Sequence, residues 1–277
     1  MRQALHHGRL RLLAQPIVAA GALHRIGPSE GRLHYEILSR RLDDQDREIS
    51  PARFRPAIAR ARLLEQFDRA VIERTLSRLG TDAALRHATH CCSINITGPT
   101  LCDSGFPTYL ARQLALHAID PAMITLEITE SVAMQDPQAC IERLDAIRQL
   151  GVHVAIDDFG TGYSSLATLL DYPVTGLKLD RAFAQRLAQD ATGPTSRLVS
   201  GLIELTDRLE LRGIAEGIET ARQESLLRKL GWHCGQGWLF GHAEPPHEYP
   251  KVPSMRRPGE TLAGSDNSSA TLSDAVD

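Results

Sequence analysis

The stretch Val152–Ser165 reads VHVAIDDFGTGYSS, and it contains the features that decide the fold and point to a site. Its first five residues are almost all apolar, which predicts a buried strand, and the glycines further on predict a turn. Between them lie two adjacent acids, Asp157 and Asp158. Two carboxylates about 4 Å apart repel by roughly 4 kcal/mol at an effective dielectric constant of about 20, and a bound divalent cation would turn that repulsion into affinity. The pair alone is as typical of a helix-capping aspartate beside a turn aspartate, so the rest of the chain must decide.

Eight short apolar runs predict strands separated by helices. The runs are Leu10–Val18, Leu33–Arg40, His90–Ile96, Ile124–Thr129, Val152–Ile156, Gly176–Asp180, Leu211–Ala215 and His233–Trp238. Segments between them, such as Pro137–Leu150, Arg181–Leu209 and Ala221–Leu230, have apolar residues three and four positions apart, as crossover helices do. The order predicts an α/β fold, a (β/α)8 barrel of TIM type rather than an open sheet. The glycine fingerprint of dinucleotide-binding folds does not follow the first run.

Polar residues alternate with apolar ones inside these runs, and successive strand residues point to opposite faces. We therefore expect the apolar set to meet the outer helices and the polar set to line the interior and mouth of the barrel. The polar residues that come late in their runs are Glu36, Asn95, Glu127, Asp157, Asp158, Lys178, Glu216 and Gln236. A closed barrel would bring all of them to the mouth, where this architecture places its chemistry.

The ligand chemistry of this set favours a hard cation. Its candidate ligands are oxygen donors without cysteine or histidine, which selects Mg²⁺ or Mn²⁺ over zinc, with Ca²⁺ as a poor substitute. Five carboxylates suffice for two dications, which could activate a water and stabilise a leaving oxygen at a phosphodiester. Taken singly, each residue has a simpler interpretation as a solvated strand end or a turn residue. We interpret His34, His90 and His153, which lie near the starts of their strands, as structural.

Composition excludes several classes of protein. The 277 residues are 42% hydrophobic and have a formal net charge of −3, so no global field attracts long nucleic acid. Gln15 and Pro16 interrupt the first apolar run, which is therefore neither a signal peptide nor a membrane span. Five cysteines without CxxC spacing indicate a reducing, cytoplasmic setting and buried apolar roles. We expect one domain over residues 1–250 and a disordered tail over 251–277.

These residues resemble, in order, the motifs of the EAL-domain cyclic di-GMP phosphodiesterases. The matching motifs are Gln15-Pro16-Ile17-Val18, Glu36-Ile37-Leu38-Ser39-Arg40, Asn95-Ile96-Thr97, Glu127-Ile128-Thr129-Glu130-Ser131, the Asp157 loop, Leu177-Lys178-Leu179-Asp180, Ala215-Glu216-Gly217-Ile218-Glu219-Thr220 and Gln236-Gly237. The resemblance implies a TIM-like barrel with one early strand antiparallel, and hydrolysis of cyclic di-GMP to linear pGpG.

The resemblance also implies a role for each matching residue. Glu36, Asn95, Glu127 and Asp157 would hold one metal, and Asp157, Asp158 and Glu216 would hold or orient a second with its water, beside Lys178. Gln15, Leu38, Arg40 and Gln236 map to substrate positions, while Glu130 and Glu219 map to acids that brace the loop containing Gly160 and Gly162. The metals would be Mg²⁺ or Mn²⁺, with Ca²⁺ inhibitory.

The chain departs from the family pattern at three places. The signature triplet reads Glu36-Ile37-Leu38 instead of Glu-Ala-Leu, the usual Ala-Glu reads Ile58-Ala59, and the usual Arg-Pro reads His242-Ala243. None of the three removes a predicted metal ligand. The main hypothesis is an active phosphodiesterase, and the alternative is a catalytically silent receptor that binds cyclic di-GMP and signals to a protein partner. A homodimer, and sensor or regulatory domains outside this chain, are compatible with either.

Overall fold

The computed structural model describes residues 9–19, 32–129, 137–160 and 168–246. Its strands are β1 (Leu10–Ala19), β2 (Leu33–Leu42), β3 (Glu48–Ile49), β4 (Thr89–Asn95), β5 (Ile124–Thr129), β6 (His153–Phe159), β7 (Gly176–Leu179), β8 (Arg212–Ala215) and β9 (Cys234–Gln236). All eight predicted strands are present, and β3 is an addition that pairs with the end of β2. The expected tail at 251–277 lies outside the described residues, so the domain division stays a prediction.

The sheet closes into a barrel through its first strand. The order of strands is β1-β9-β8-β7-β6-β5-β4-β2-β3, and an additional β1–β2 pairing joins the two ends of an eight-stranded ring. β1 is antiparallel to both β2 and β9, whereas each neighbouring pair around the rest of the ring, from β2–β4 to β8–β9, is parallel. The prediction of a TIM-like barrel with one early antiparallel strand is therefore confirmed.

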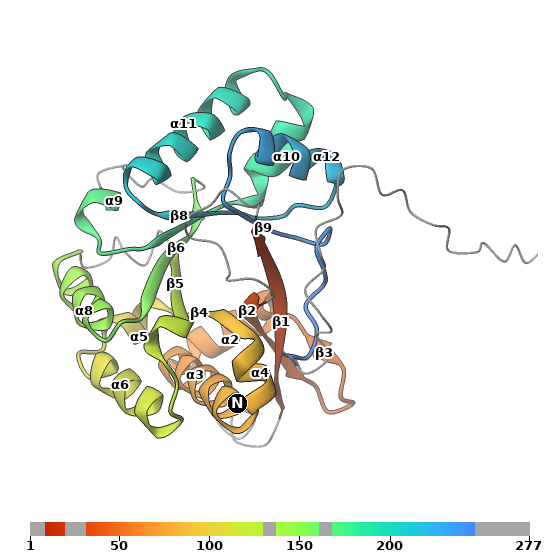
Figure 1. Ribbon diagram of the computed structural model, residues 1–277. Helices are drawn as coiled ribbons and strands as arrows, with labels where there is room; N and C mark the ends of the chain where they lie inside the picture. The colour runs from red at the N-terminus through yellow and green to blue at the C-terminus, as the bar shows by residue number, and fades with distance from the viewer. Residues whose placement is uncertain (1–8, 20–31, 130–136, 161–167, 247–277) are drawn as a thin grey trace, which may run out of the picture.

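Helices surround the barrel, as Figure 1 shows. They are α2 (Pro51–Arg60), α3 (Leu64–Thr81), α4 (Ala83–Ala88), α5 (Gly98–Cys102), α6 (Phe106–Leu116), the 3-10 turn η1 (Pro121–Met123), α8 (Pro137–Gln149), α9 (Thr168–Asp171), α10 (Arg181–Gln189), α11 (Pro194–Arg208) and α12 (Ala221–Lys229). The single helix expected over Arg181–Leu209 is instead two helices. The second helix starts at Pro194, and the preceding residue, Gly193, has an extended backbone, because a residue that precedes proline disfavours helical angles.

The main hydrophobic core lies between the strands and the helices. Outward-facing strand residues such as Ile94, Leu126 and Leu177 are fully buried in one cluster with helix residues such as Leu76 and Leu144. For these strands the prediction that apolar residues face the outer helices is therefore correct. Ile17, Ile214 and Cys234 form a second, separate cluster. Ile214 pairs with Lys178 in the β7–β8 register, so this apolar residue faces the barrel interior and departs from the predicted sorting.

Two further expectations from composition can be compared with the structure. All five cysteines are free thiols, and four of them are buried, but Cys102 at the end of α5 is exposed. The description of all five as buried apolar residues was therefore wrong for Cys102. Among the helices that the structure describes, none has the length and apolar character needed to cross a bilayer.

Gly160, directly after β6, has a backbone conformation that a substitution can test. Its φ of +93° is a left-handed conformation, and an added Cβ would lie 2.6 Å from the Phe183 ring. We expect Gly160→Ala to lower the free energy of unfolding by at least about 1 kcal/mol. Gly201→Ala in α11 is the matched control, because nothing lies within 4 Å of its new Cβ, and it should raise stability by about 0.5–1 kcal/mol. Urea unfolding measures both, and a Gly160→Ala protein as stable as wild type would contradict the described backbone.

Candidate functional site

A buried lysine forms the centre of the barrel mouth. Lys178 on β7 has no solvent exposure. Its Nζ lies 3.1 Å from Glu36 Oε2, 2.8 Å from Glu127 Oε2, 3.3 Å from Asp157 Oδ1 and 2.6 Å from Glu216 Oε1. The four carboxylates come from β2, β5, β6 and the residue after β8. The barrel therefore brings carboxylates that are up to 180 positions apart in the sequence to a single ammonium group.

Three amides extend this cluster into a continuous polar layer. Asn95 Nδ2 donates to Glu36 Oε1 at 2.5 Å, and Gln236 Nε2 donates to Glu36 Oε2 at 2.7 Å. Gln236 Nε2 also lies 3.2 Å from Gln15 Oε1. The antiparallel first strand explains this contact, because its register sets Gln15 opposite Glu36 and Ile17 opposite Gln236. An early strand in the opposite direction thus adds Gln15 to a site otherwise built from parallel strands.

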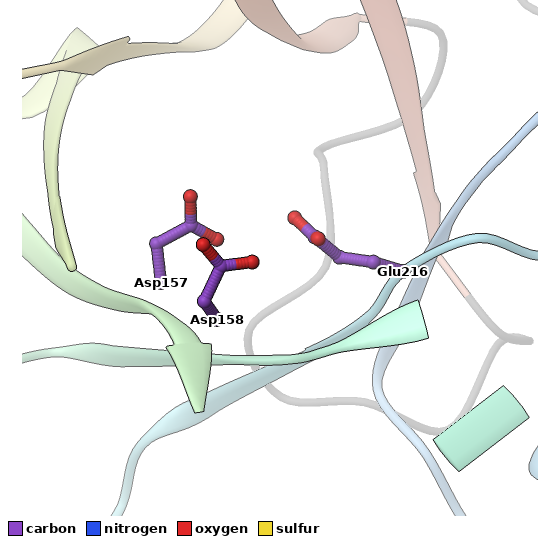
Figure 2. A group of neighbouring side chains, drawn as sticks. All are labelled: Asp157, Asp158 and Glu216. Atoms are coloured by element: carbon purple, nitrogen blue, oxygen red, sulfur yellow. The ribbon is translucent and has the colours of Figure 1, made fainter. Parts of the chain in front are cut away.

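Asp158 reaches the site through a local irregularity that alternation does not predict. Strict alternation would point Asp158 away from Asp157. The β6–β7 register shifts between Ile156 and Phe159, which is a β-bulge, and Asp158 has a φ of +57°. Carboxylate oxygens of Asp157, Asp158 and Glu216 consequently lie within 4.8 Å of one another, and Figure 2 shows the two aspartates facing Glu216 across the mouth. Aspartate is one of the few residues that adopt positive φ readily, and this was the available sequence signal.

The electrostatics of the layer reflect crowded negative charge in a buried place. Burial raises the pKa of Glu127 well above its usual range, with Lys178 opposing the shift and Glu36 adding to it. Burial likewise raises the pKa of Glu216 to about 8. Burial alone would lower the pKa of Lys178, but the surrounding carboxylates outweigh it and hold that pKa well above its usual value. The charged form of the lysine is therefore favoured, whereas burial favours the protonated forms of Glu127 and Glu216.

The remaining predicted residues lie at the rim or outside the described part. Leu38 and Arg40 follow Glu36 on the same face of β2, where Arg40 donates to the Ser39 carbonyl and lies 3.9 Å from Glu48. Glu219 is exposed, and its backbone N–H donates to Gln223 Oε1. Glu130, with Gly162 and most of the loop it was expected to brace, lies outside the described residues. The bracing roles of Glu130 and Glu219 therefore stay predictions.

A TIM-like barrel whose mouth holds a cluster of acids around a lysine has the architecture of a TIM-barrel enzyme active site. Comparison with known proteins identifies the family. Residues 1–243 match the model of the EAL domain. The chain belongs to the EAL-domain family of cyclic di-GMP phosphodiesterases.

Two curated relatives and one solved structure illustrate the similarity. The bifunctional diguanylate cyclase/cyclic di-GMP phosphodiesterase MucR of Pseudomonas aeruginosa is 33% identical over 248 residues, which are 90% of this chain and 35% of that protein. The probable cyclic di-GMP phosphodiesterase PdeB of Escherichia coli is 34% identical over 73% of this chain and 37% of its own length. The chain thus spans little more than a third of these relatives. The structure of the PaMucR phosphodiesterase in complex with c-di-GMP superposes with a TM-score of 0.77 at 34% identity, over 88% of this chain and 95% of that one.

The raised pKa of Glu216 generates a prediction for the cation-free protein. A pKa raised from 4.5 to about 8 on folding stabilises the folded state below about pH 4.5, and that stabilisation is lost as the pH rises through 8. We expect the stability of wild type relative to Glu216→Gln to fall by an amount on the order of a few kcal/mol between pH 5 and 9 in EDTA.

Urea unfolding at a series of pH values measures this difference, and Glu204→Gln is a matched control. Glu204 is an exposed acid on α11 paired with Arg208, so its removal should leave the pH dependence of wild type intact. A difference between wild type and Glu216→Gln that does not change with pH would show that Glu216 titrates normally.

Proposed function

We propose that this chain hydrolyses cyclic di-GMP to linear pGpG in a reaction that requires divalent cations. The observation that carries the proposal is the completeness of the polar layer around Lys178. Every acidic, amide and lysine position that the family resemblance assigns to the reaction is present in the described barrel, apart from the bracing Glu130. The membership of the chain in a phosphodiesterase family supports the same reaction class.

The residues at the mouth fit a pair of hard cations. Five carboxylates, those of Glu36, Glu127, Asp157, Asp158 and Glu216, and one ammonium leave a formal charge of −4 when all are ionised. Two dications would neutralise this charge. Among the described residues, Glu127 Oε1 and Gln236 Oε1 are buried oxygens with no hydrogen-bond partner. Buried acceptors without donors suit a cation, and an all-oxygen set selects Mg²⁺ or Mn²⁺.

We assign the ligands as the resemblance suggests. Glu36, Asn95, Glu127 and Asp157 would hold one ion, and Asp157, Asp158 and Glu216 would hold the other. When bound, the ions would supply positive charge to the phosphodiester and make a nearby water more acidic.

Lys178 acts in this scheme as a hydrogen-bond donor and a fixed positive charge. Its pKa is held far above neutrality, so it has no lone pair with which to accept a proton from water. An ammonium group among acids can orient a water and stabilise negative charge that grows on the oxygens bound to phosphorus during attack. Its rigid place between four carboxylates gives that orientation without reorganisation at the moment of reaction.

The dinucleotide would lie over this layer and contact the rim. Gln15 and Gln236 present amides at the floor of the mouth, and Leu38 presents a half-buried apolar side chain beside them. Arg40, further along the same face of β2, is suited to a phosphate oxygen because its guanidinium can donate two parallel hydrogen bonds. These four residues are our proposed substrate contacts.

The first prediction of this proposal concerns the cations. Hydrolysis should require Mg²⁺ or Mn²⁺ and stop in EDTA, and Ca²⁺ should inhibit because its larger, flexible coordination shell misplaces the attacking water. Chromatography of cyclic di-GMP and pGpG measures the rates. Full turnover after exhaustive chelation would refute the assigned ligands.

The second prediction separates catalysis from binding. Lys178→Ala should still bind cyclic di-GMP but lose most of its turnover, because the lysine acts mainly in the transition state. Glu216→Gln keeps the shape of the side chain and removes a charge, so it should lower hydrolysis by about a hundredfold or more.

Calorimetry in Ca²⁺ and hydrolysis in Mg²⁺ check both variants, with Lys229→Ala and Glu204→Gln as controls. Lys229 ends α12 and Glu204 forms an exposed pair on α11, so both controls should match wild type. If wild type binds cyclic di-GMP without hydrolysing it, and neither site variant changes this, the chain is a receptor and not a phosphodiesterase.

A further inference from the structure

Thr97, the last residue of the Asn95-Ile96-Thr97 motif, has no role in the proposed reaction, and the structure gives it an unusual partner. Thr97 is buried against Asp68, which lies on α3 and is only 1% exposed. Asp68 Oδ2 accepts three hydrogen bonds: from Thr97 N at 2.8 Å, from Thr97 Oγ1 at 2.6 Å and from Thr100 Oγ1 at 2.5 Å. One buried oxygen therefore holds both the backbone and the side chain of Thr97.

Thr97 lies where the chain leaves β4 toward α5, two residues after Asn95. Between them, Ile96 N donates to the Glu127 carbonyl at 2.9 Å, which extends the ladder between β4 and β5. The segment 95–97 is thus fixed to β5 on one side and to α3 on the other. Asn95 itself donates to Glu36 from this fixed segment.

An ordinary helix cap does not explain this arrangement. Asp82 before α4 and Asp180 before α10 cap their helices with local side chains, each accepting from a backbone N–H two or three residues on. The five-residue helix α5 has no side-chain cap, and Asp68, which comes from another helix, accepts from Thr97 N and from two hydroxyls and not from a backbone N–H of the first turn of α5. Asp68 is fully enclosed, and its Oδ1 has no hydrogen-bond partner among the described residues. Burying a carboxylate has a large desolvation cost. The start of a five-residue helix alone does not account for a carboxylate buried at this cost.

We propose that Asp68 is a positioning residue for the cation site: through Thr97 it fixes the end of β4 and thereby the direction of the Asn95 carboxamide toward Glu36. The inference rests on the proposed function for the identity of the cation site, but the link from Asp68 to Asn95 is a property of the chain without cations. Groups that orient ligands in this way typically change metal affinity by about 10- to 100-fold when they are removed.

The experiment uses the whole chain and two readouts, of which one needs neither metal nor substrate. Amide hydrogen exchange in EDTA reports the mobility of residues 95–97, and calorimetry with Mn²⁺ reports affinity. We expect Asp68→Asn and Thr97→Val to exchange faster at 95–97 and to bind Mn²⁺ at least about tenfold more weakly than wild type. Thr97→Ser keeps the hydroxyl that Thr97→Val removes, so it should match wild type in both readouts.

Asp82→Asn is the matched control for a merely structural effect. Asp82 also lies on the path into β4, but it caps α4 before the start of the strand and accepts from Leu85 N. Its replacement should lower the thermal midpoint and leave the Mn²⁺ affinity unchanged. If Asp68→Asn does not fold, Thr97→Val decides the question.

The outcomes are distinct for the inference and for the proposed function. Folded Asp68→Asn and Thr97→Val proteins with wild-type exchange at 95–97 and wild-type Mn²⁺ affinity would overturn the inference. If wild type binds no Mn²⁺ at all, the proposed function fails, and exchange at 95–97 alone then tests the link: faster exchange in both variants supports it, and unchanged exchange overturns it.

Discussion

The structure depends on how the barrel accommodates one buried ammonium among four carboxylates. Moving a lysine or an acid from water into a protein interior costs several kcal/mol per ion after relaxation, and only close opposite charges and hydrogen bonds offset this cost. Lys178 has four such partners within 3.3 Å. The acids, however, outnumber the lysine. Burial is the main reason that the pKa values of Glu127 and Glu216 are raised, and the neighbouring acids raise them further while Lys178 opposes the shift. A site with this composition is poised to bind cations.

The fold can afford such a layer because its stability comes from elsewhere. Among the described residues, the outward faces of the strands and the inner faces of the helices form one large apolar cluster, and Ile17, Ile214 and Cys234 form a separate small one. Closure through β1 also matters for function. Because β1 runs against its neighbours, Gln15 meets both Glu36 and Gln236 in the polar layer. The direction of β1 in the sheet therefore determines that Gln15 belongs to the site.

Much of this was predictable from local patterns in the sequence. Apolar runs located the eight barrel strands, and alternation placed Asn95, Glu127 and Lys178 on the inner face, because strand periodicity is a local property. Two features were not predictable in this way. The bulge that turns Asp158 inward depends on pairing with β7, and the contact of Asp68 with Thr97 joins residues from different elements. The break at Gly193-Pro194 follows from a local rule, which the expectation of one helix over Arg181–Leu209 did not apply. Helical spacing does place Asp68 on the same face as Val71, Ile72 and Thr75, but that periodicity does not identify its partner in another element.

The most direct test of the central claim, that the acidic layer is a cation site, is anomalous diffraction from crystals of the chain grown with Mn²⁺ and cyclic di-GMP. The account predicts two neighbouring anomalous peaks at the mouth, one near Glu36, Asn95, Glu127 and Asp157 and the other near Asp157, Asp158 and Glu216. It would be contradicted by bound cyclic di-GMP with no anomalous peak at the mouth and with Lys178 still the sole cation among the carboxylates.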